Sequence, residues 1–405
     1  MRGLSESTAC LITGLIIVID ILAYFAMIKN LSLFKKHSNR NRFTFIYFLL
    51  FAVYIGLWFF TMARPSAIRN AQNYGLFYVV TAYTTLNLFS KSLVCIGFLI
   101  AQLLLKFRQK YASKVIINVS FILSAGLALT IIYGIFIGKR TITTEKVDIS
   151  FENLPTQLDG TTIIHISDFH LGSFNSTATL NRCAKIINNL NADILVFTGD
   201  MVNNFASEMN GLEEPLKHMN AKHGKYAIYG NHDYGDYSNW NTLKDRKQNF
   251  IQIGNNIVNA GFTLLDNDNV KIQIKDTCLY LIGVQNWGNE PFPKYADFTK
   301  ASGNISPTNA FKILLTHDPA HWEHEIVSHT NVSLTLSGHT HGGQLGISFA
   351  GITLSPMYFI EHLWNGLYEA GEQKLYVNRG FGCVGFPGRI NMPPEITLIT
   401  LRKKK

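Results

Sequence analysis

The stretch Leu334–Gln344, LTLSGHTHGGQ, is an alternating apolar run that ends in a turn of small residues carrying two histidines, His339 and His341. Alternation of this kind is typical of a short β-strand, and the glycines of the turn let the backbone bend tightly and approach a bound group. We expect the strand to present both imidazoles at its carboxyl end. Two histidines one residue apart suggest a metal site, but a pair in a loop is weak evidence until its partners are found.

Partners come from further strand-like runs in the same part of the chain. Val147, Ile149 and Phe151 alternate with polar residues, and helical stretches such as residues 177–190 separate several of the later runs. This alternation predicts an α/β sandwich with mixed sheets. The other runs are TIIHIS (162–167), DILVFTG (193–199), KYAIYG (225–230), LYLIGV (279–284), KILLTH (312–317) and KLYVN (374–378).

Polar side chains that can bind metals or transfer protons stand at five strand ends. Because the carboxyl ends of strands converge on one edge of a sheet, we expect these groups to share a site. Asp, His and Asn supply oxygen and nitrogen ligands that suit Mn, Fe or Zn, rather than the all-oxygen cage of calcium or the thiolates of structural zinc. Two such ions about 3.5–4 Å apart need a bridging carboxylate, and together they can clamp a phosphoester. The residues are Asp168, His170, Asp200, Asn231, His232, Asp233, His317, Asp318, His339 and His341, with Asp200 as the natural bridge.

These strand ends also carry a family resemblance. SDFHLG, FTGD, YGNHD, LTHDP and SGHTHGGQ resemble, in this order, the five motifs of the calcineurin-like metallophosphoesterases. The resemblance covers residues 147–402, and the opening VDISFENLPTQLDGTTIIHISDFHLG and closing FPGRINMPPEITLITL are similar to membrane-associated bacterial members. It implies an α/β/β/α sandwich with mixed sheets and the hydrolysis of phosphomono- or diesters.

The resemblance further implies two divalent metal ions, Mn, Fe or Zn, and a role for each site residue. Asp200 would be shared by both ions, and a hydroxide bridging them would attack in line with the leaving group. His232 would contact the phosphate and protonate the leaving oxygen, while Asp233 would orient the His232 ring. The glycines after His341 would give clearance for the substrate phosphate. One metal would be held by Asp168, His170 and His341, and the other by Asn231, His317 and His339.

The part of the chain before residue 147 has a different composition. It contains four apolar runs of about 20 residues or more, which is long enough to cross the hydrocarbon core of a membrane as helices. Residues 1–146 carry 16 Lys and Arg against three acidic residues, so the positive charge of the chain lies there, which argues against nucleic-acid binding. Five cysteines without a CxxC pair argue against a disulfide framework and a zinc ribbon. The four apolar runs are residues 9–28, 43–62, about 76–105 and 115–138. We therefore expect a four-span transmembrane domain at 1–138, a linker at 139–146 and a metallophosphoesterase domain at 147–405.

The charges of the loops predict an orientation. Five Lys and Arg residues lie between positions 29 and 42 and four between 106 and 114, whereas the loop between the second and third runs has two. By the positive-inside rule, the richer loops face the cytoplasm. We expect an integral protein of the bacterial cytoplasmic membrane with its catalytic domain on the extracytoplasmic face, although Lys139, Arg140 and Lys146 oppose this orientation.

Other residues have structural interpretations. Asp20 and Lys91 lie in apolar runs, and we expect Asp20 to pair with Lys91 or to face the interior of the bundle. Arg379 and Arg389 either form structural ion pairs, which we expect, or contact a phosphate. The aromatic segment 285–300 either lines a substrate pocket, lies at the bilayer interface or is a packed loop.

Three functions remain open at this point. The first is a membrane-tethered dinuclear-metal phosphoesterase whose substrate, for example a lipid-linked phosphate or pyrophosphate, is presented at the outer face of the bilayer. The second is a cytoplasmic-facing hydrolase of nucleotide-linked lipid pyrophosphates, resembling the diacylglucosamine pyrophosphate hydrolases of the same superfamily. The third is a non-enzymatic membrane sensor or transporter with a metal-binding module, and the complete ligand set argues against it.

Overall fold

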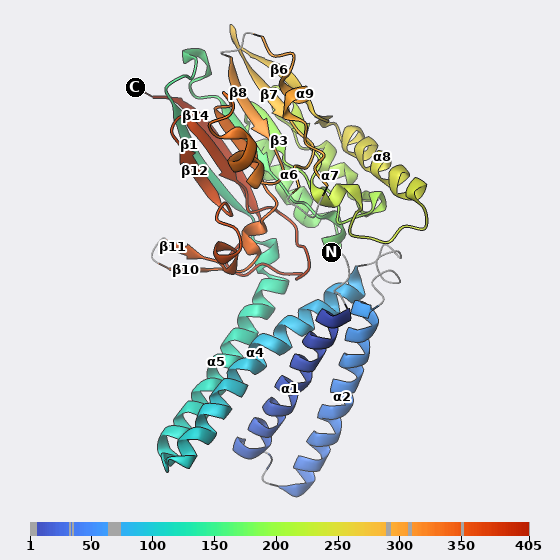
Figure 1. Cartoon of the computed structure of the whole chain (residues 1–405), viewed down its shortest axis with the longest axis vertical. Coiled ribbons are helices and arrows are strands. Elements are labelled where there is room, and N and C mark those ends of the chain that lie inside the picture. The colour runs from blue at the N-terminus through green and yellow to red at the C-terminus, as the bar shows by residue number, and fades with distance from the viewer. Residues whose placement is uncertain are drawn as a thin grey trace. The chain divides into compact units, whose positions relative to one another are not determined.

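The computed structural model describes residues 6–31, 34, 36–63, 74–288, 293–306, 310–349 and 352–404 (Figure 1). The chain forms two compact units, and each has apolar cores of its own. One unit consists of Met1–Phe136 with Gly385–Gly388, and the other of Ile137–Val384 with Arg389–Lys405.

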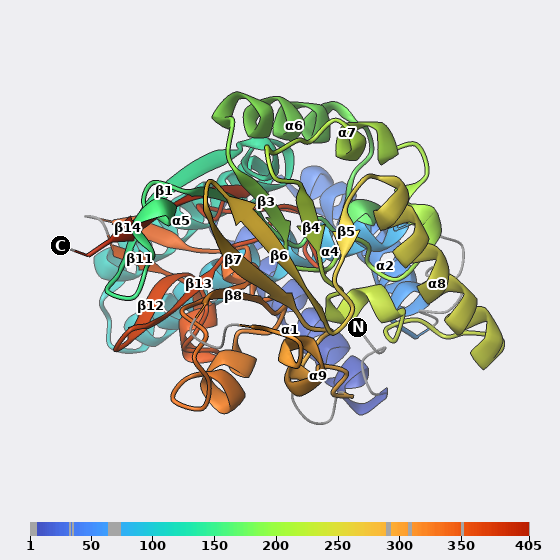
Figure 2. The same ribbon diagram turned by 90° about the horizontal axis from the view of Figure 1, so that it is seen from above.

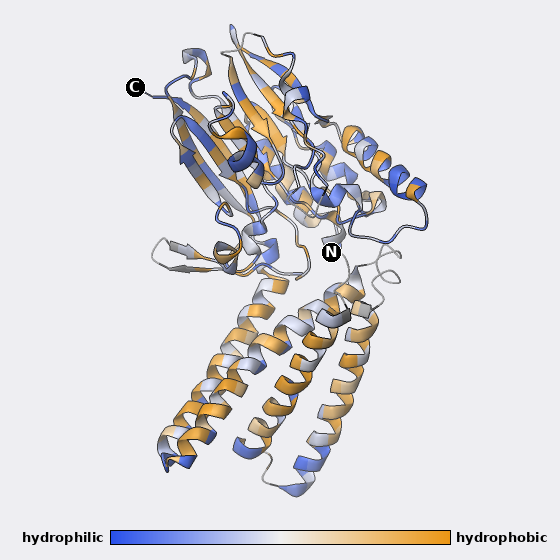
Figure 3. Cartoon of the chain, viewed as in Figure 1, coloured by the Kyte–Doolittle hydropathy of each residue, from blue (hydrophilic) through white to orange (hydrophobic). Residues whose placement is uncertain are grey.

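The first unit holds four long helices, α1 (Glu6–Asn30), α2 (His37–Ala63), α4 (Gly75–Lys106) and α5 (Lys110–Phe136). All four are long and apolar enough to cross a membrane, and Figure 3 shows hydrophobic residues along much of their length. Many of their large apolar side chains are exposed, for example Leu11 at 72% and Ile122 at 71%. The four predicted apolar helices are therefore confirmed. Because apolar surface of this extent suits a lipid environment, the chain is a membrane protein.

A buried charge lies among these helices. Asp20 of α1 is 1% exposed and forms an ion pair with Lys91 of α4. Its carboxylate also accepts hydrogen bonds from Asn87 Nδ2 at 2.6 Å and from Tyr47 Oη at 3.0 Å, and Lys91 Nζ lies 3.0 Å from the same Tyr47 oxygen. The predicted pairing of Asp20 with Lys91 is therefore confirmed. Since the carboxylate is paired and fully hydrogen-bonded by α2 and α4, the cluster connects three helices.

The second unit is built on two six-stranded sheets and one small ribbon. In spatial order, the first sheet contains β1 (Thr143–Phe151), β14 (Glu395–Lys403), β2 (Thr162–Ile166), β3 (Ile194–Phe197), β4 (Lys225–Ala227) and β5 (Thr263–Leu264). The second sheet contains β12 (Gly366–Ala370), β13 (Gln373–Val377), β9 (Leu334–Ser337), β8 (Phe311–Leu315), β7 (Thr277–Gly283) and β6 (Asp268–Ile274). The ribbon pairs β10 (Ile347–Phe349) with β11 (Ile352–Leu354).

Parallel strands form the centre of both sheets. β2, β3 and β4 pair in parallel in the first sheet, and β7, β8 and β9 do so in the second. β14 runs antiparallel to β2, and β6 runs antiparallel to β7, so both sheets are mixed as predicted. Strands covered on both faces need continuous apolar runs, and every residue of β3 (ILVF) and β8 (FKILL) is buried.

The sheets and helices form four layers. The inner core lies between the sheets and joins residues such as Ile163 and Val196 of the first sheet to Ile313 and Leu336 of the second. Helices α6 (Ala178–Leu190), α7 (Glu213–Lys217) and α8 (Leu243–Asn259) pack on the outer face of the first sheet. Helix α9 (Phe298–Ser302) and the turn Trp322–Ile326 cover the second sheet (Figure 2). The predicted α/β/β/α sandwich is therefore confirmed.

The aromatic segment after β7 packs against the domain in its described part. Trp287 is 3% exposed, its ring stacks on His324 with the centroids 5.1 Å apart, and Lys294 Nζ lies 4.0 Å from its ring centroid. Of the three interpretations, the packed loop holds for Trp287, because a buried ring cannot enter the bilayer. Residues 289–292 of this segment lie outside the described residues.

The Asp20–Lys91 pair leads to a stability prediction. Lys91→Met leaves a buried carboxylate without its counter-charge, so we expect a loss of about 3–5 kcal/mol in the free energy of unfolding. Asp20→Asn combined with Lys91→Met removes both charges and should cost much less. Thermal unfolding of the full chain in detergent measures both, with Lys106→Met at the exposed end of α4 as the control. A single variant as stable as the double variant would contradict the structural role.

Candidate metal centre

Five strand ends deliver the residues of the site. In the first sheet, β2 leads to Asp168 and His170, its neighbour β3 leads to Asp200, and β4 leads to Asn231. In the second sheet, β8 leads to His317, and its parallel neighbour β9 leads to a turn with two further histidines. The carboxyl ends of the central strands of both sheets thus supply every ligand that the sequence predicted.

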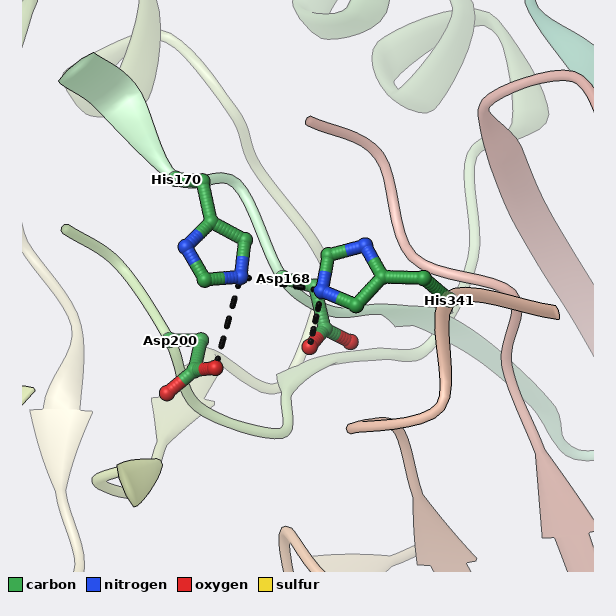
Figure 4. A group of neighbouring side chains, drawn as sticks. All are labelled: Asp168, His170, Asp200 and His341. Atoms are coloured by element: carbon green, nitrogen blue, oxygen red, sulfur yellow. Dashed lines mark hydrogen bonds and ion pairs between the residues drawn. The ribbon is translucent and has the colours of Figure 1, made fainter. Parts of the chain in front are cut away.

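Four of these ligands form one cluster (Figure 4). One ligand atom each of Asp168, His170, Asp200 and His341 lies within 4.8 Å of all the others, and the four side chains are buried. The Nε2 atoms of His170 and His341 face each other at 3.0 Å. His170 Nε2 is 3.3 Å from Asp200 Oδ2, and His341 Nε2 is 3.4 Å from Asp168 Oδ1. The donor atoms therefore converge on one point.

The other three predicted ligands form an adjoining cluster. Asn231 Oδ1 lies 2.9 Å from His317 Nε2 and 3.0 Å from His339 Nδ1, and these two nitrogens are 3.2 Å apart. His317 Nε2 is also 3.2 Å from Asp200 Oδ2, the same oxygen that lies 3.3 Å from His170 Nε2. Asp200 therefore stands between the two clusters, which is the position expected of a bridging ligand.

The chemistry of this donor set fits divalent metal ions. Oxygen and nitrogen donors without a thiolate suit Mn, Fe or Zn. Buried carboxylates and imidazoles of this density are costly without a cation among them, because burial strips them of water. The chain therefore holds a candidate divalent-metal site, and its donors come from both sheets.

Neighbouring groups set which atom of each ligand faces the centre. His317 Nδ1 donates to Thr198 O at 2.7 Å, which leaves Nε2 as the ligand atom. Asn231 Nδ2 donates to Tyr237 Oη at 2.6 Å, which turns Oδ1 toward the two histidines. The Tyr237 ring also stacks on His232 with the centroids 4.4 Å apart. Sequence reasoning missed Tyr237, since it stands outside the five motifs and nothing in its type marks this contact.

His232 lies beside the first cluster, and its ring is 4.8 Å from the His170 ring by centroids. Its main-chain N–H donates to Asp200 Oδ1 at 2.8 Å, and its Nδ1 lies 2.8 Å from Asn203 O. A carbonyl can only accept, so Nδ1 carries the proton and Nε2 is left to face a substrate.

The prediction that the Asp233 carboxylate orients His232 is wrong, because the Asn203 carbonyl takes that place. Asp233 instead accepts hydrogen bonds from the main-chain N–H groups of Gly230, Asp200 and Val202 at 2.9, 3.0 and 3.2 Å. It therefore holds the two loops that carry Asp200 and Asn231 against each other.

Burial and the shared charges set the protonation of the ligands. Burial raises the pKa of Asp168. Burial also opposes charge on Asp200, but electrostatic interactions with His317 and His232 and the hydrogen bonds of His170 and His317 together outweigh it and lower the Asp200 pKa well below its usual value. Burial alone would lower the pKa of His317, whereas the Asp200 carboxylate raises it to about 10. Burial, together with the charge of His170, lowers the pKa of His341. Asp200 is therefore ionised and His341 neutral near pH 7, the forms in which both can bind a metal.

The backbone at this centre is strained. Asp168, His170, Asp200, His339 and His341 have φ angles of 54°, 44°, 61°, 74° and 56°. Residues other than glycine rarely adopt this left-handed region, and each costs of order 1–3 kcal/mol, so it persists only where its surroundings impose it. Five such residues in one site indicate that ligand placement dominates the local conformation.

Two glycines allow the ligand carboxylates to lie this close to neighbouring backbone. A Cβ atom on Gly338 would overlap Asp168 Oδ2, and one on Gly230 would overlap Asp200 Oδ1. Gly342 and Gly343 do not provide clearance for a substrate as expected. Their missing Cβ atoms would contact Met392 at 3.1 Å and Ser355 at 2.7 Å, so protein fills that space.

The two arginines behind the centre differ from each other. Arg379 pairs with Glu395 at 2.7 Å and with Glu145, so its predicted structural ion pair is confirmed. For Arg389 that prediction is wrong. Its buried guanidinium donates to the main-chain carbonyls of Gly382 at 2.9 Å and of Arg379 and Met392 at 3.1 Å. It thereby ties the C-terminal loop to the back of the site.

Comparison with known proteins agrees with this geometry. The calcineurin-like phosphoesterase family matches residues 161–343, which contain all seven predicted ligands. The uncharacterized metallophosphoesterase YkuE of Bacillus subtilis is 31% identical over 275 residues, which are 67% of this chain and 89% of YkuE.

Two further relatives have more descriptive names. A zebrafish (Danio rerio) transmembrane protein with metallophosphoesterase domain is 29% identical over 285 residues, 68% of this chain and 61% of the relative. The UDP-2,3-diacylglucosamine pyrophosphatase LpxG of Chlamydia trachomatis is 30% identical over 298 residues, 61% of this chain and 86% of LpxG. With its ordered motifs, its sandwich fold and these relatives, the chain belongs to the calcineurin-like metallophosphoesterase family and is a metal-dependent phosphoester hydrolase.

Proposed function

We propose that this protein is a membrane-tethered phosphoesterase that uses two divalent metal ions to hydrolyse a lipid-linked phosphoester or pyrophosphate. The observation that carries the proposal is the position of Asp200 Oδ2, 3.3 Å from His170 Nε2 and 3.2 Å from His317 Nε2. One carboxylate oxygen between two sets of donors supports two neighbouring ions that share it.

The chain supplies a separate group for each part of the reaction. Asp168, His170 and His341 would hold one ion, and Asn231, His317 and His339 the other, with Asp200 between them. When bound, the ions lower the pKa of water and stabilise charge on the phosphoryl oxygens. The protein would hold the ester beside the ions and exclude solvent from the buried donors.

His232 is the proposed general acid. Burial lowers the pKa of His232 well below its usual value, so the free protein holds it neutral. A phosphate anion beside Nε2 would favour the charged ring and raise that pKa, so substrate binding itself would load the proton for the leaving oxygen. Asn203 O holds the Nδ1 proton and keeps the ring aimed.

These roles separate in two variants. His232→Ala should keep the metal content of the wild type and lower kcat by about 10²–10⁴-fold, because only proton transfer and phosphate contact are lost. Asp200→Ala should lose metal, because it removes the shared ligand. Elemental analysis and phosphodiesterase assays on the same preparations measure both, with exposed His329→Ala as the control. Equal metal loss in the two variants would overturn the division of roles.

The membrane helices and the relatives support a lipid-linked substrate. Four apolar helices confine the catalytic unit to the membrane surface, where substrates anchored in the bilayer are concentrated. One relative is named a UDP-2,3-diacylglucosamine pyrophosphatase, and a diacyl substrate carries two acyl chains.

The substrate class can be tested with matched pairs of compounds. We expect kcat/KM for a lipid-linked pyrophosphate in nanodiscs to exceed that for its water-soluble head group by at least about tenfold, since the bilayer presents the substrate. Assays with Mn, Zn and Fe measure both compounds. Equal values would reject the lipid-linked substrate while the phosphoesterase class would stand.

The orientation of the catalytic unit decides between two substrate pools. The loop charges favour the extracytoplasmic face, whereas a hydrolase of nucleotide-linked lipids would face the cytoplasm. We expect a C-terminal alkaline phosphatase fusion to be active in a bacterial host and a C-terminal green fluorescent protein fusion to be dark. The reverse pattern would favour the nucleotide-linked substrate.

A further inference from the structure

A small pocket lies in the second unit beside the loop that follows His170. Its volume is about 50 Å³, and its lining includes Lys139, Arg140, Ser173, Thr179 and Cys383. A single water needs only about 10–15 Å³, so this pocket has room for a larger group. No carboxylate is among the lining residues.

The two cations of the pocket have no acidic partner in the part of the chain that the structure describes. Neither the Lys139 ammonium nor the Arg140 guanidinium has a hydrogen bond or an ion pair with a described residue. Lys139 is only half exposed, so it has given up part of its hydration without a counter-charge. Such a group favours an anion close by.

Hydrogen-bond donors line part of the remaining wall, beside the rings of Phe174 and Phe381. Ser173 Oγ accepts the main-chain N–H of Cys383 at 3.2 Å, which leaves its own hydroxyl proton free to point to a ligand. Thr179 contributes a second hydroxyl. Two cations and two hydroxyls without an acid are the donors that bind a phosphate group.

Chain connectivity places two of the lining residues, Lys139 and Arg140, directly after a helix that can span the membrane. Lys139 and Arg140 form a short turn, Gly138–Arg140, directly after α5. The apolar segment Lys110–Arg140 is long enough to cross the bilayer, so these cations follow its last apolar residues. Phosphates of lipid head groups lie at that level, and anionic lipids attract basic residues there.

The walls of the pocket continue into the metal centre. Ser173 lies in the same loop as His170, three residues further on. On the other wall, Gly382 N donates to Asp168 O at 2.8 Å. A group held in the pocket therefore sits against the two loops that carry metal ligands.

We propose that this pocket is a second anion site, separate from the metal ions, which binds a phosphate group at the membrane surface. The group belongs either to an anionic phospholipid head group or to a soluble phosphate. This binding does not depend on hydrolysis, so it can be tested separately from the proposed function.

The test uses the full-length, metal-loaded protein. Native mass spectrometry from detergent measures binding of short-chain phosphatidylglycerol, with phosphatidylcholine as the neutral lipid and inorganic phosphate as the soluble probe. In Lys139→Gln/Arg140→Gln we expect the Kd for phosphatidylglycerol to rise at least about tenfold, because two charge-assisted contacts are lost. Lys146→Gln/Lys185→Gln removes the same charge at exposed positions outside the pocket and should leave the Kd unchanged.

Each outcome decides the assignment. If binding of inorganic phosphate weakens in the pocket variant and phosphatidylglycerol does not bind, the pocket takes soluble phosphate. If both double variants lose lipid binding equally, the effect comes from net charge and the pocket assignment is overturned. The assignment is also overturned if the pocket variant changes the Kd of neither phosphatidylglycerol nor inorganic phosphate. Thr179→Val keeps both charges and should weaken binding by about two- to fivefold, which provides a test if the charge variant does not fold.

Discussion

The carboxylate of Asp200 is the contact on which the second unit depends. One oxygen lies near His170 on one side and His317 on the other, so a ligand of the first sheet meets a ligand of the second. This contact requires the carboxyl ends of β2 and β3 to face those of β8 and β9 across the inner core. The site therefore depends on the sandwich, since the packing that buries the apolar faces of the two sheets also brings the donor atoms together.

The cost of this arrangement appears in the backbone and in the groups around it. Five ligands have left-handed φ angles, which ordinary sequences avoid. Asp233 accepts three main-chain N–H groups from the loops that carry Asp200 and Asn231, and buried Arg389 binds three carbonyls behind His341. These buried polar groups hold in place the loops that carry the predicted ligands.

In the helical unit, too, polar groups from neighbouring segments satisfy a buried charge, here in a lipid environment. Asp20 would be costly in lipid if it were alone, and Lys91, Asn87 and Tyr47 satisfy it from two other helices. The polar cluster therefore specifies which helix faces meet, which apolar side chains cannot do in lipid because tails and side chains are equally apolar.

The residue types and their order already determined much of this protein. Strands buried on both faces need runs of apolar residues, which predicted β3 and, apart from Lys312, β8. Ligand chemistry restricts each motif position to Asp, His or Asn. All seven candidate ligands were predicted in this way, as were the four apolar helices and the pair of Asp20 with Lys91.

Only the tertiary structure decided which main-chain groups bind each side chain and which distant segments pair with each other. Every residue has a carbonyl, so nothing in the sequence marked Asn203 O as the partner of His232, or the carbonyls that bind Arg389. The sequence also did not mark the position of β14, which lies between β1 and β2 in the first sheet. Nor did it mark the contact of Tyr237 with Asn231, which depends on where two loops meet. Local sequence sets what each residue can do, whereas the packing of distant segments decides which partner it meets.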